Sequence, residues 1–413
     1  MIYSVSKEFA LSLDKKDNLG GYRKHFHYPK NIRGEELIYF SGNSLGLQPK
    51  KVPDYIKKEL DIWSMEGVKG QESRWISFHE KLTRPTAKLI GANDSEVVVM
   101  NALTVNIHLL LVSFYQPRGN RVKIMIEKDA FPSDQYAVQS QVKFHGYNPQ
   151  DTIIELTPRK NEKILHHKDI LKAINDHGDE IALIYLGGVN YYTGQAFDLE
   201  MIAKAGRSKG CYVGFNLAHS VGNTYLALHD WGIDFSAWCT YKYLCSGPGS
   251  PSGIYIHKRH HNWSGPRFLG WWGHNKNSRF DMPSIFDPIC TAEGWQISNA
   301  PIMGMAPLLA SLEIYDKIGM VAVSNKGKKL STYMEYLIKE LVPDVKIITP
   351  ERRGCQLSII ANAGKKIFHY LEDHNVVCDW RNPDVIRVAP HPLYNTFYEV
   401  FQFVNILRKA FEQ

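Results

Sequence analysis

The sequence lacks the features that mark membrane, secreted and metal-binding proteins. No apolar run reaches the about 20 residues that a membrane-spanning helix needs, and acids and lysines interrupt the N-terminal segment where a signal peptide would be apolar. The 6 cysteines are scattered, with no Cys-x-x-Cys pair and no spacing typical of metal ligands. We therefore expect a cytoplasmic protein with reduced thiols, no membrane segment and no metal site.

The charge pattern of a nucleic-acid-binding surface is missing as well. The net charge is +7, but lysine and arginine are dispersed and form no basic stripe. Internal repeats and low-complexity linkers are also absent. A mild positive excess suits a small anionic ligand equally well. We expect a small-molecule substrate and no nucleic-acid partner.

Short apolar runs alternate with helical patterns through the middle of the chain. The patterns predict strands at 122–128, 152–157, 181–186, 211–216, 234–241 and 253–257, and helices at 134–145 and 198–209. Strands that alternate with helices indicate βαβ units. The predicted fold class is therefore α/β, with a mostly parallel sheet that has helices on both faces.

The pattern changes near residue 300. A long helix with apolar periodicity is predicted at 301–318, and mixed helices and strands follow it. With 413 residues, the chain is long enough for a large and a small domain, each with its own core. We predict an N-terminal segment, 1–50, that packs with the small domain, a large domain, 51–305, and a small α+β domain, 306–413.

Polar side chains follow the predicted strands at the sheet edge where ligands bind in doubly wound folds. Ser133 follows the first strand and lies at the start of a helix, whose free N–H groups suit an anion. Asn216 and His219 follow a later strand, and Lys242 ends another. We expect these side chains to meet at one edge of the sheet.

Each of these features alone has an ordinary explanation. A serine such as Ser133 is more often a helix N-cap, a histidine such as His219 is more often a hydrogen-bonded core residue, and the tyrosines beside Lys242 could simply pack on a sheet. Together, an anion site, a polar strand end and a lysine among aromatic residues are typical of pyridoxal phosphate (PLP) chemistry. In that chemistry a lysine of lowered pKa forms a Schiff base, so we expect Lys242 to bind PLP covalently.

Beyond these single features, the chain resembles the kynureninase family of PLP enzymes over nearly its whole length. The resemblance rests on YFSGNSLGLQPK (39–50), MNALTVNIHLL (100–110), AFPSDQYA (130–137), GVNYYTGQ (188–195), GCYVGFNLAHSVGN (210–223), WGIDFSAWCTYKYLCSGPGS (231–250), GWWGH (270–274), RFDM (279–282), QISNAPI (296–302) and VVCDWRNPDVIRVAPHPLYN (376–395). Their order and joint presence make it specific. It implies the aspartate-aminotransferase-like fold, with a seven-stranded, mostly parallel sheet.

The resemblance also implies roles for single residues. The catalytic residues would be Lys242 and Tyr241. Arg387 would bind the carboxylate of the substrate, for which its two-pronged donor is suited; its apolar neighbours argue against the alternative, a surface salt bridge. Further substrate contacts would come from Asn43, Trp272 and Ser298. Cofactor contacts would come from Leu103, Thr104, Phe131, Ser133, Asp134, Asn216, His219, Tyr241 and Lys242, and from Trp271 and Asn299 across the interface of a homodimer with shared active sites.

The implied reaction is hydrolysis of the Cβ–Cγ bond of L-kynurenine or 3-hydroxykynurenine. The products would be L-alanine and anthranilate or 3-hydroxyanthranilate, and Lys242 would serve as Schiff-base partner and as general acid and base. The sequence does not choose between the two substrates.

One position departs from the family pattern in a way that bears on this reaction. The family's strand-end motif reads Asp-Leu-Ala-His, whereas this chain has Asn216 in place of the aspartate that keeps the pyridine nitrogen protonated. Three interpretations stay open: Asp134 shares the work, the enzyme has another substrate or reaction such as a β-lyase, or the protein is a weakly active or inactive PLP binder.

Milder departures concern the part of the pocket that would hold the aromatic ring of the substrate. Val68 or Lys69 stands where animal relatives carry a histidine, and Ala300 and His391 also differ from the family pattern. These changes leave the predicted fold and PLP binding unaffected.

Overall fold

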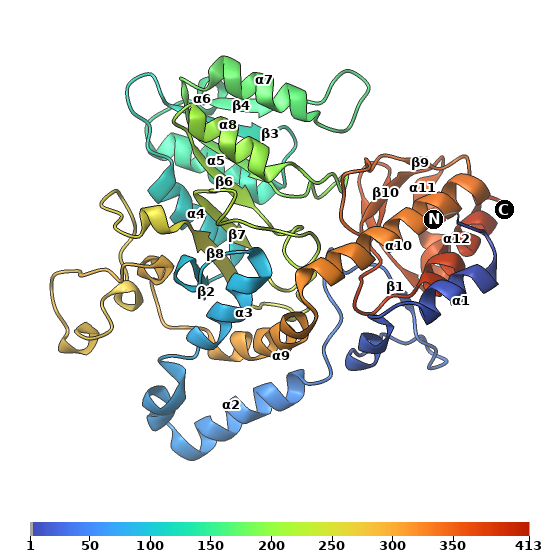
Figure 1. Cartoon of the computed structure of the whole chain (residues 1–413), viewed down its shortest axis with the longest axis horizontal. Helices are drawn as coiled ribbons and strands as arrows, with labels where there is room; N and C mark the ends of the chain where they lie inside the picture. Colours follow the sequence, from blue (N-terminus) through green and yellow to red (C-terminus); the bar gives the residue numbers. More distant parts are fainter. Residues whose placement is uncertain (1–2, 413) are drawn as a thin grey trace.

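A seven-stranded sheet forms the centre of the larger part of the molecule in the computed structural model, which describes residues 3–412 (Figure 1). The strand order is β2-β8-β7-β6-β5-β3-β4, and β8 runs antiparallel to both of its neighbours. These strands are β2 (Val97–Met100), β3 (Lys123–Glu127), β4 (Ile153–Leu156), β5 (Ile181–Gly187), β6 (Tyr212–Asn216), β7 (Phe235–Trp238) and β8 (Ser252–Ile256).

The sheet separates two apolar layers because successive side chains of a strand point to opposite faces. In β2, Val97 and Val99 belong to one core cluster, whereas Val98 and Met100 belong to another. The first cluster includes side chains of α3 (Glu80–Ile90), α7 (His167–His177), α8 (Leu199–Ser208) and α9 (Ile302–Ile318); the second includes side chains of α4 (Leu103–Phe114) and α5 (Pro132–Phe144). Helices therefore cover both faces of the sheet, as near-continuous apolar strands predict.

The smaller part of the molecule has a four-stranded antiparallel sheet with the order β12-β13-β10-β9 (Figure 1). Its core cluster includes side chains from the helices that pack on this sheet. The elements are α10 (Met320–Leu341), β9 (Lys346–Ile347), β10 (Leu357–Ile360), α11 (Gly364–Asp373), β12 (Asp379–Arg381), β13 (Val385–Val388) and α12 (Phe397–Phe411).

The N-terminal segment lies against this smaller part. The Asp14 carboxylate, in α1 (Lys7–Lys15), accepts hydrogen bonds of 2.7 and 3.0 Å from two backbone N–H groups at the start of α12. An acidic side chain there satisfies free N–H groups and complements the helix dipole. Farther along, β1 (Ile38–Tyr39) pairs in parallel with β11 (Val376–Val377). The domain boundaries given above stay a prediction.

The predicted strands and helices of the middle of the chain are present, with small shifts at their ends. The strand expected to reach Tyr241 ends at Trp238, so Lys242 lies in the following loop. Several elements were not predicted, among them β2, α3, α7 and α2 (Val52–Glu66), which projects from the body of the molecule in Figure 1. A short α6 (Pro149–Thr152) precedes β4. In residues 3–412 we find no helix that is long and apolar enough to cross a membrane.

Candidate active site

A cavity of about 380 Å³ lies at the carboxyl edge of the seven-stranded sheet. The ends of β3, β5 and β6 reach it with Glu127, Gly187 and Asn216, and the loop after β7 reaches it with Lys242. This is the edge at which ligands bind in open α/β sheets. The smaller sheet closes one side of the cavity with Arg381 and Arg387.

Two helix N-termini face this cavity without a capping side chain. The first residues of α4, Leu103 and Thr104, line the cavity, and the N-cap residue Ala102 offers no side-chain hydrogen bond. The first turn of α5 lines it as well, through Ser133, and its N-cap residue Phe131 also makes no capping bond. The N–H groups of a first helical turn have no partner within the helix, so two such ends with a serine hydroxyl form a site for a phosphate group.

Lys242 lies beside His219 in the same cavity, with 2.8 Å between the lysine Nζ and the histidine Nε2. Burial lowers the pKa of Lys242, and the charges of Arg387 and Arg381 lower it further against the opposing influence of Cys239 and Asp134. Burial and the charge of Lys242 hold the pKa of His219 well below its usual range. A neutral imidazole therefore accepts a hydrogen bond from an amine whose proton is weakly held.

Asp134 and Asn216 form a buried pair on another side of the cavity. The Asn216 amide donates to both carboxylate oxygens of Asp134, at 2.9 and 3.0 Å, and the hydroxyl of Tyr185 donates to one of them at 3.1 Å. Burial raises the pKa of Asp134 to about 6, although these hydrogen bonds and the charge of Lys242 oppose the shift. The pair thus holds one carboxylate whose affinity for a proton is raised.

Arg387 reaches the cavity from β13 and is 1% exposed. Its Nε and Nη2 donate to the Asp379 carboxylate, at 3.1 and 2.8 Å. Its Nη1 donates to the carbonyl of Tyr191 at 2.7 Å. Arg381 pairs with the same carboxylate at 3.0 Å. One partly buried aspartate therefore orients two guanidinium groups at the cavity wall.

The structure brings together most of the residues expected from the sequence. The residues that line the cavity are Asn43, Leu103, Thr104, Phe131, Ser133, Asp134, Asn216, His219, Tyr241, Lys242 and Arg387. Four others do not line it. Ser298 and Asn299 are exposed, Trp271 is 42% exposed, and Trp272 is buried beneath the guanidinium of Arg279. The role of each residue stays a prediction.

Several residues that line the cavity were not predicted from the sequence. Arg381 gave no signal, because it reaches the cavity through the antiparallel register of β12 with β13, which places Asp379 opposite Arg387 and is known only from the structure. Glu127 and Tyr185 gave none either, since they stand within or at the end of strands whose apolar residues predict burial. Asn190 and Tyr191 belong to a matched stretch, 188–195, but were given no role.

The residues that depart from the family pattern lie outside the cavity lining, Asn216 excepted. Val68 is 82% exposed beyond the end of α2, and Ala300 is partly buried. His391 is fully buried, and its Nε2 lies 2.9 Å from the carbonyl oxygen of Tyr243. Burial lowers the pKa of His391 to about 3. His391 therefore acts as a neutral core residue.

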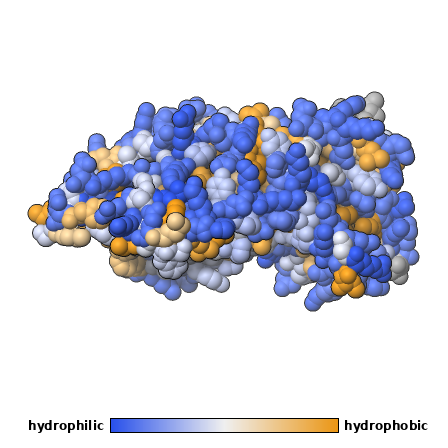
Figure 2. All heavy atoms as spheres, turned by 90° about the horizontal axis from the view of Figure 1, so that it is seen from below, coloured by the Kyte–Doolittle hydropathy of each residue, from blue (hydrophilic) through white to orange (hydrophobic). Residues whose placement is uncertain are grey.

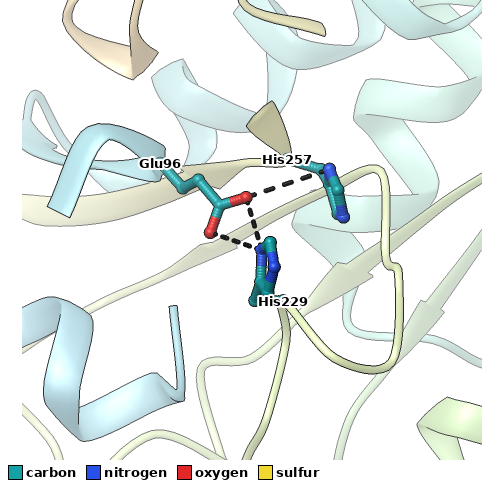
Figure 3. A group of neighbouring side chains, drawn as sticks. All are labelled: Glu96, His229 and His257. Atoms are coloured by element: carbon teal, nitrogen blue, oxygen red, sulfur yellow. Dashed lines mark hydrogen bonds and ion pairs between the residues drawn. The ribbon is translucent and has the colours of Figure 1, made fainter. Parts of the chain in front are cut away.

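A second group of polar side chains, Glu96, His229 and His257, lies apart from the cavity (Figure 3). The Glu96 carboxylate is 2.9 Å from His229 Nδ1, and it accepts hydrogen bonds from the backbone N–H groups of Asn93 and Lys258, each at 2.8 Å. His257 Nδ1, 3.8 Å from that carboxylate, accepts from the N–H of Arg259. The Glu96 carboxylate and the two histidine Nδ1 atoms therefore have their partners within the protein. We call Glu96, His229 and His257 the clasp, because they connect loops that are distant in the sequence.

Comparison with known proteins identifies the family. The chain is 49% identical to a kynureninase of Christiangramia forsetii over 99% of both chains, and 45% identical to human kynureninase over 98% of this chain and 93% of the relative. The chain belongs to the kynureninase family. In addition, residues 323–407 match the model of the kynureninase C-terminal domain. The resemblance stated from the sequence is therefore confirmed.

Solved structures show the fold of this kynureninase family member. A cystine C–S lyase in complex with cysteine persulfide superposes with a TM-score of 0.78 at 17% identity, covering 90% of this chain and 97% of that one. A cysteine desulfurase from Thermococcus onnurineus gives a TM-score of 0.76 at 18% identity, covering 94% of this chain and 97% of that one. The predicted fold, a seven-stranded and mostly parallel α/β sheet with a smaller α+β part, is confirmed.

Proposed function

We propose that this protein is a PLP-dependent hydrolase that cleaves the Cβ–Cγ bond of L-kynurenine or 3-hydroxykynurenine. The products are L-alanine and anthranilate or 3-hydroxyanthranilate. The observation that carries the proposal is the position of Lys242 in a full-length kynureninase family member: the lysine points into a cavity with a ready phosphate site, a buried carboxylate and a buried arginine.

The cavity residues fit the cofactor on their own chemistry. The open N-termini of α4 and α5 suit the phosphate, the exposed ring of Phe131 offers a surface for stacking, and Lys242 offers an amine of lowered pKa. The Nδ1 of His219 and the Oδ1 of Asn43 are buried without a partner in residues 3–412, which leaves polar atoms for a ligand. When bound, PLP supplies an electron-accepting ring that stabilises negative charge on the carbon atoms of an amino acid.

Lys242 has two tasks in this reaction. Its lowered pKa raises the fraction of the amine that is unprotonated and nucleophilic, which suits a residue that would hold the cofactor covalently. With substrate bound to the cofactor, the freed Lys242 amine would act as the general base that takes the proton of the substrate α-carbon and as the acid that gives a proton back. His219 accepts from Nζ at 2.8 Å and keeps the amine directed into the cavity.

Substrate selection begins at the carboxylate. Arg387 has five N–H groups, of which three are engaged by Asp379 and Tyr191, so Nη1 and Nη2 each retain one donor. Two parallel donors match the two oxygens of an α-carboxylate. Asn43, with its free Oδ1, is placed to accept a hydrogen bond from the same substrate.

We infer a homodimer from the apolar side chains that remain exposed on one chain. Around α2 these are Leu60, Trp63, Met65 and Val68; in the later loops they are Phe268, Leu269, Trp271, Phe280, Met282 and Ile285. Figure 2 shows apolar atoms gathered at the left end of the molecule, the end at which those loops lie in Figure 1. Large exposed apolar patches mark protein interfaces. We infer that a second chain covers this surface, and that Trp271 and Asn299 of each chain complete the cavity of the partner.

Product analysis of the purified protein with PLP tests the proposed activity. With L-kynurenine or 3-hydroxykynurenine we expect the fluorescent anthranilate product and an equal amount of alanine. Lys242→Ala should abolish both, whereas Lys143→Ala, on the exposed surface of α5, should leave turnover unchanged. Sulfide released from cysteine without any anthranilate would point to a β-lyase, and no product from any amino acid would point to an inactive PLP binder.

A further inference from the structure

The two carboxylates that line the cavity, Glu127 and Asp134, are held in different ways. Glu127 has both oxygens engaged in its own loop: Oε1 accepts from the N–H of Gly187 and Oε2 from the amide of Asn190, each at 2.7 Å. These bonds hold the backbone at the end of β5. Glu127 is therefore part of the wall. Asp134 accepts only from the side chains of Tyr185 and Asn216, and Asn216 stands where the family pattern has the aspartate of the ring nitrogen, so we assign Asp134 to the cofactor.

The orientation of Asn216 is fixed by its neighbours. Its Nδ2 faces the Asp134 carboxylate, and its Oδ1 accepts from the N–H of Ala218 at 3.0 Å. Exchanging the two amide atoms would set an oxygen against a carboxylate and an NH₂ group against an N–H, so the reverse orientation is excluded. The Asn216 amide is neutral, and its NH₂ group donates to the Asp134 carboxylate.

We propose that Asp134 alone keeps the ring nitrogen of PLP protonated in this protein, and that Asn216 is a positioning residue that holds the Asp134 carboxylate toward it. A protonated pyridine nitrogen is a cation and requires an opposite charge beside it. The proposal rests on the proposed function, because it presupposes that PLP occupies this cavity.

The surroundings of Asp134 support this assignment. The carboxylate is 9% exposed by residue, so its charge is poorly screened by water and acts strongly on a neighbouring cation. Tyr185 and Asn216 donate to it together, which favours its ionised form and opposes the rise in its pKa that burial causes. The cationic groups of the cavity, Lys242, Arg381 and Arg387, otherwise oppose a further positive charge. Without Asp134, the ring nitrogen would lose the only carboxylate left to it in the described cavity lining.

Nitrogen-15 NMR of the holoenzyme tests the proposal independently of activity. PLP labelled with nitrogen-15 in its ring is bound to the wild type and to Asp134→Asn, Asp134→Glu and Glu127→Gln, and the chemical shift reports whether the ring nitrogen carries a proton. We expect a protonated nitrogen in the wild type, in Asp134→Glu and in Glu127→Gln, and an unprotonated one in Asp134→Asn, with PLP affinity weakened about tenfold. Asp134→Ser serves as the second neutral variant if Asp134→Asn does not fold.

An unprotonated nitrogen in the wild type, or a protonated one in a folded neutral variant, would overturn the proposal. Borohydride reduction of the same samples separates this failure from that of the proposed function. A phosphopyridoxyl group on the Lys242 peptide shows that PLP is bound where we place it, whatever the protonation of its ring. If that adduct does not form in the wild type, the proposed function itself fails.

Discussion

Arg387 illustrates at the level of a residue how a buried charge is prepared for a ligand. The Asp379 carboxylate contacts Arg387 twice, but it also pairs with Arg381. Two guanidinium groups and one carboxylate leave a net positive charge. A buried, uncompensated positive charge is costly, and an incoming carboxylate relieves that cost. The residue therefore favours amino acids over amines of similar shape.

Replacing Arg387 by lysine tests this role while retaining the charge. Lysine is a single point charge and cannot hold Asp379 and a substrate carboxylate with parallel donors. We expect the KM for the substrate to rise about tenfold or more, with a smaller change in kcat, as a lost carboxylate contact predicts. Steady-state kinetics measure both constants.

Arg352→Lys is the matched control for this substitution. Arg352 is 55% exposed and pairs with Asp198 away from the cavity, so its replacement should change neither constant. An Arg387→Lys enzyme with an unchanged KM would show that the carboxylate binds elsewhere.

The residues of the site differ in how far the sequence could reveal them. Asn216, His219 and Lys242 follow strands, and because parallel strands end at one edge of the sheet, their meeting is predictable without a structure. Arg381 enters the cavity through a strand register that the sequence alone does not specify. Trp272, expected at the substrate, packs instead against Arg279 in a stretch without regular periodicity.

At the scale of secondary-structure elements, the clasp formed by Glu96, His229 and His257 joins segments far apart in the chain (Figure 3). Glu96 precedes β2, and Lys258, whose N–H it accepts, follows β8, so the carboxylate ties the ends of two neighbouring antiparallel strands. Burial alone would raise the pKa of Glu96, but its hydrogen bonds from Asn93, Lys258 and His229 outweigh burial and lower it.

Glu96→Gln should destabilise the fold in a pH-dependent way. A carboxyl whose pKa is lowered by folding adds stability above its ordinary pKa of 4.5, and this contribution is lost as the pH falls through the lower folded value. We expect a loss of about 2 kcal/mol at pH 7, with the difference from the wild type shrinking in acid. Urea unfolding across the acid range measures it.

The control for the clasp is Glu155→Gln, on the exposed side of β4, which should cost almost nothing at any pH. A Glu96→Gln penalty that stayed constant with pH would mean that packing, rather than charge, holds the clasp.

At the scale of the whole molecule, the exposed apolar surface and the position of Trp271 and Asn299 outside their own cavity lead to the same expectation. If each chain completes the cavity of the other, two inactive variants with damage in different halves can repair each other. Lys242→Ala damages one half, and Asn299→Ala the other.

Mixing these two variants and allowing the subunits to exchange should restore activity. Random pairing makes half of the dimers hybrids, each with one intact site, so we expect about a quarter of the wild-type turnover. Light scattering on the same samples should give the mass of two chains. Two variants that stay inactive after proven exchange would place both residues in the site of their own chain.

The cavity takes its lysine from the loop after β7, in the larger part of the molecule, and its arginine from β13, in the smaller part, which has a core cluster of its own. An amino acid bound at its amine and at its carboxylate therefore contacts both parts of the molecule. The distance between its two charged groups must match the distance between Lys242 and Arg387. A decarboxylated analogue would occupy the cavity beside Lys242 without contacting Arg387, and so would not connect the two parts of the molecule.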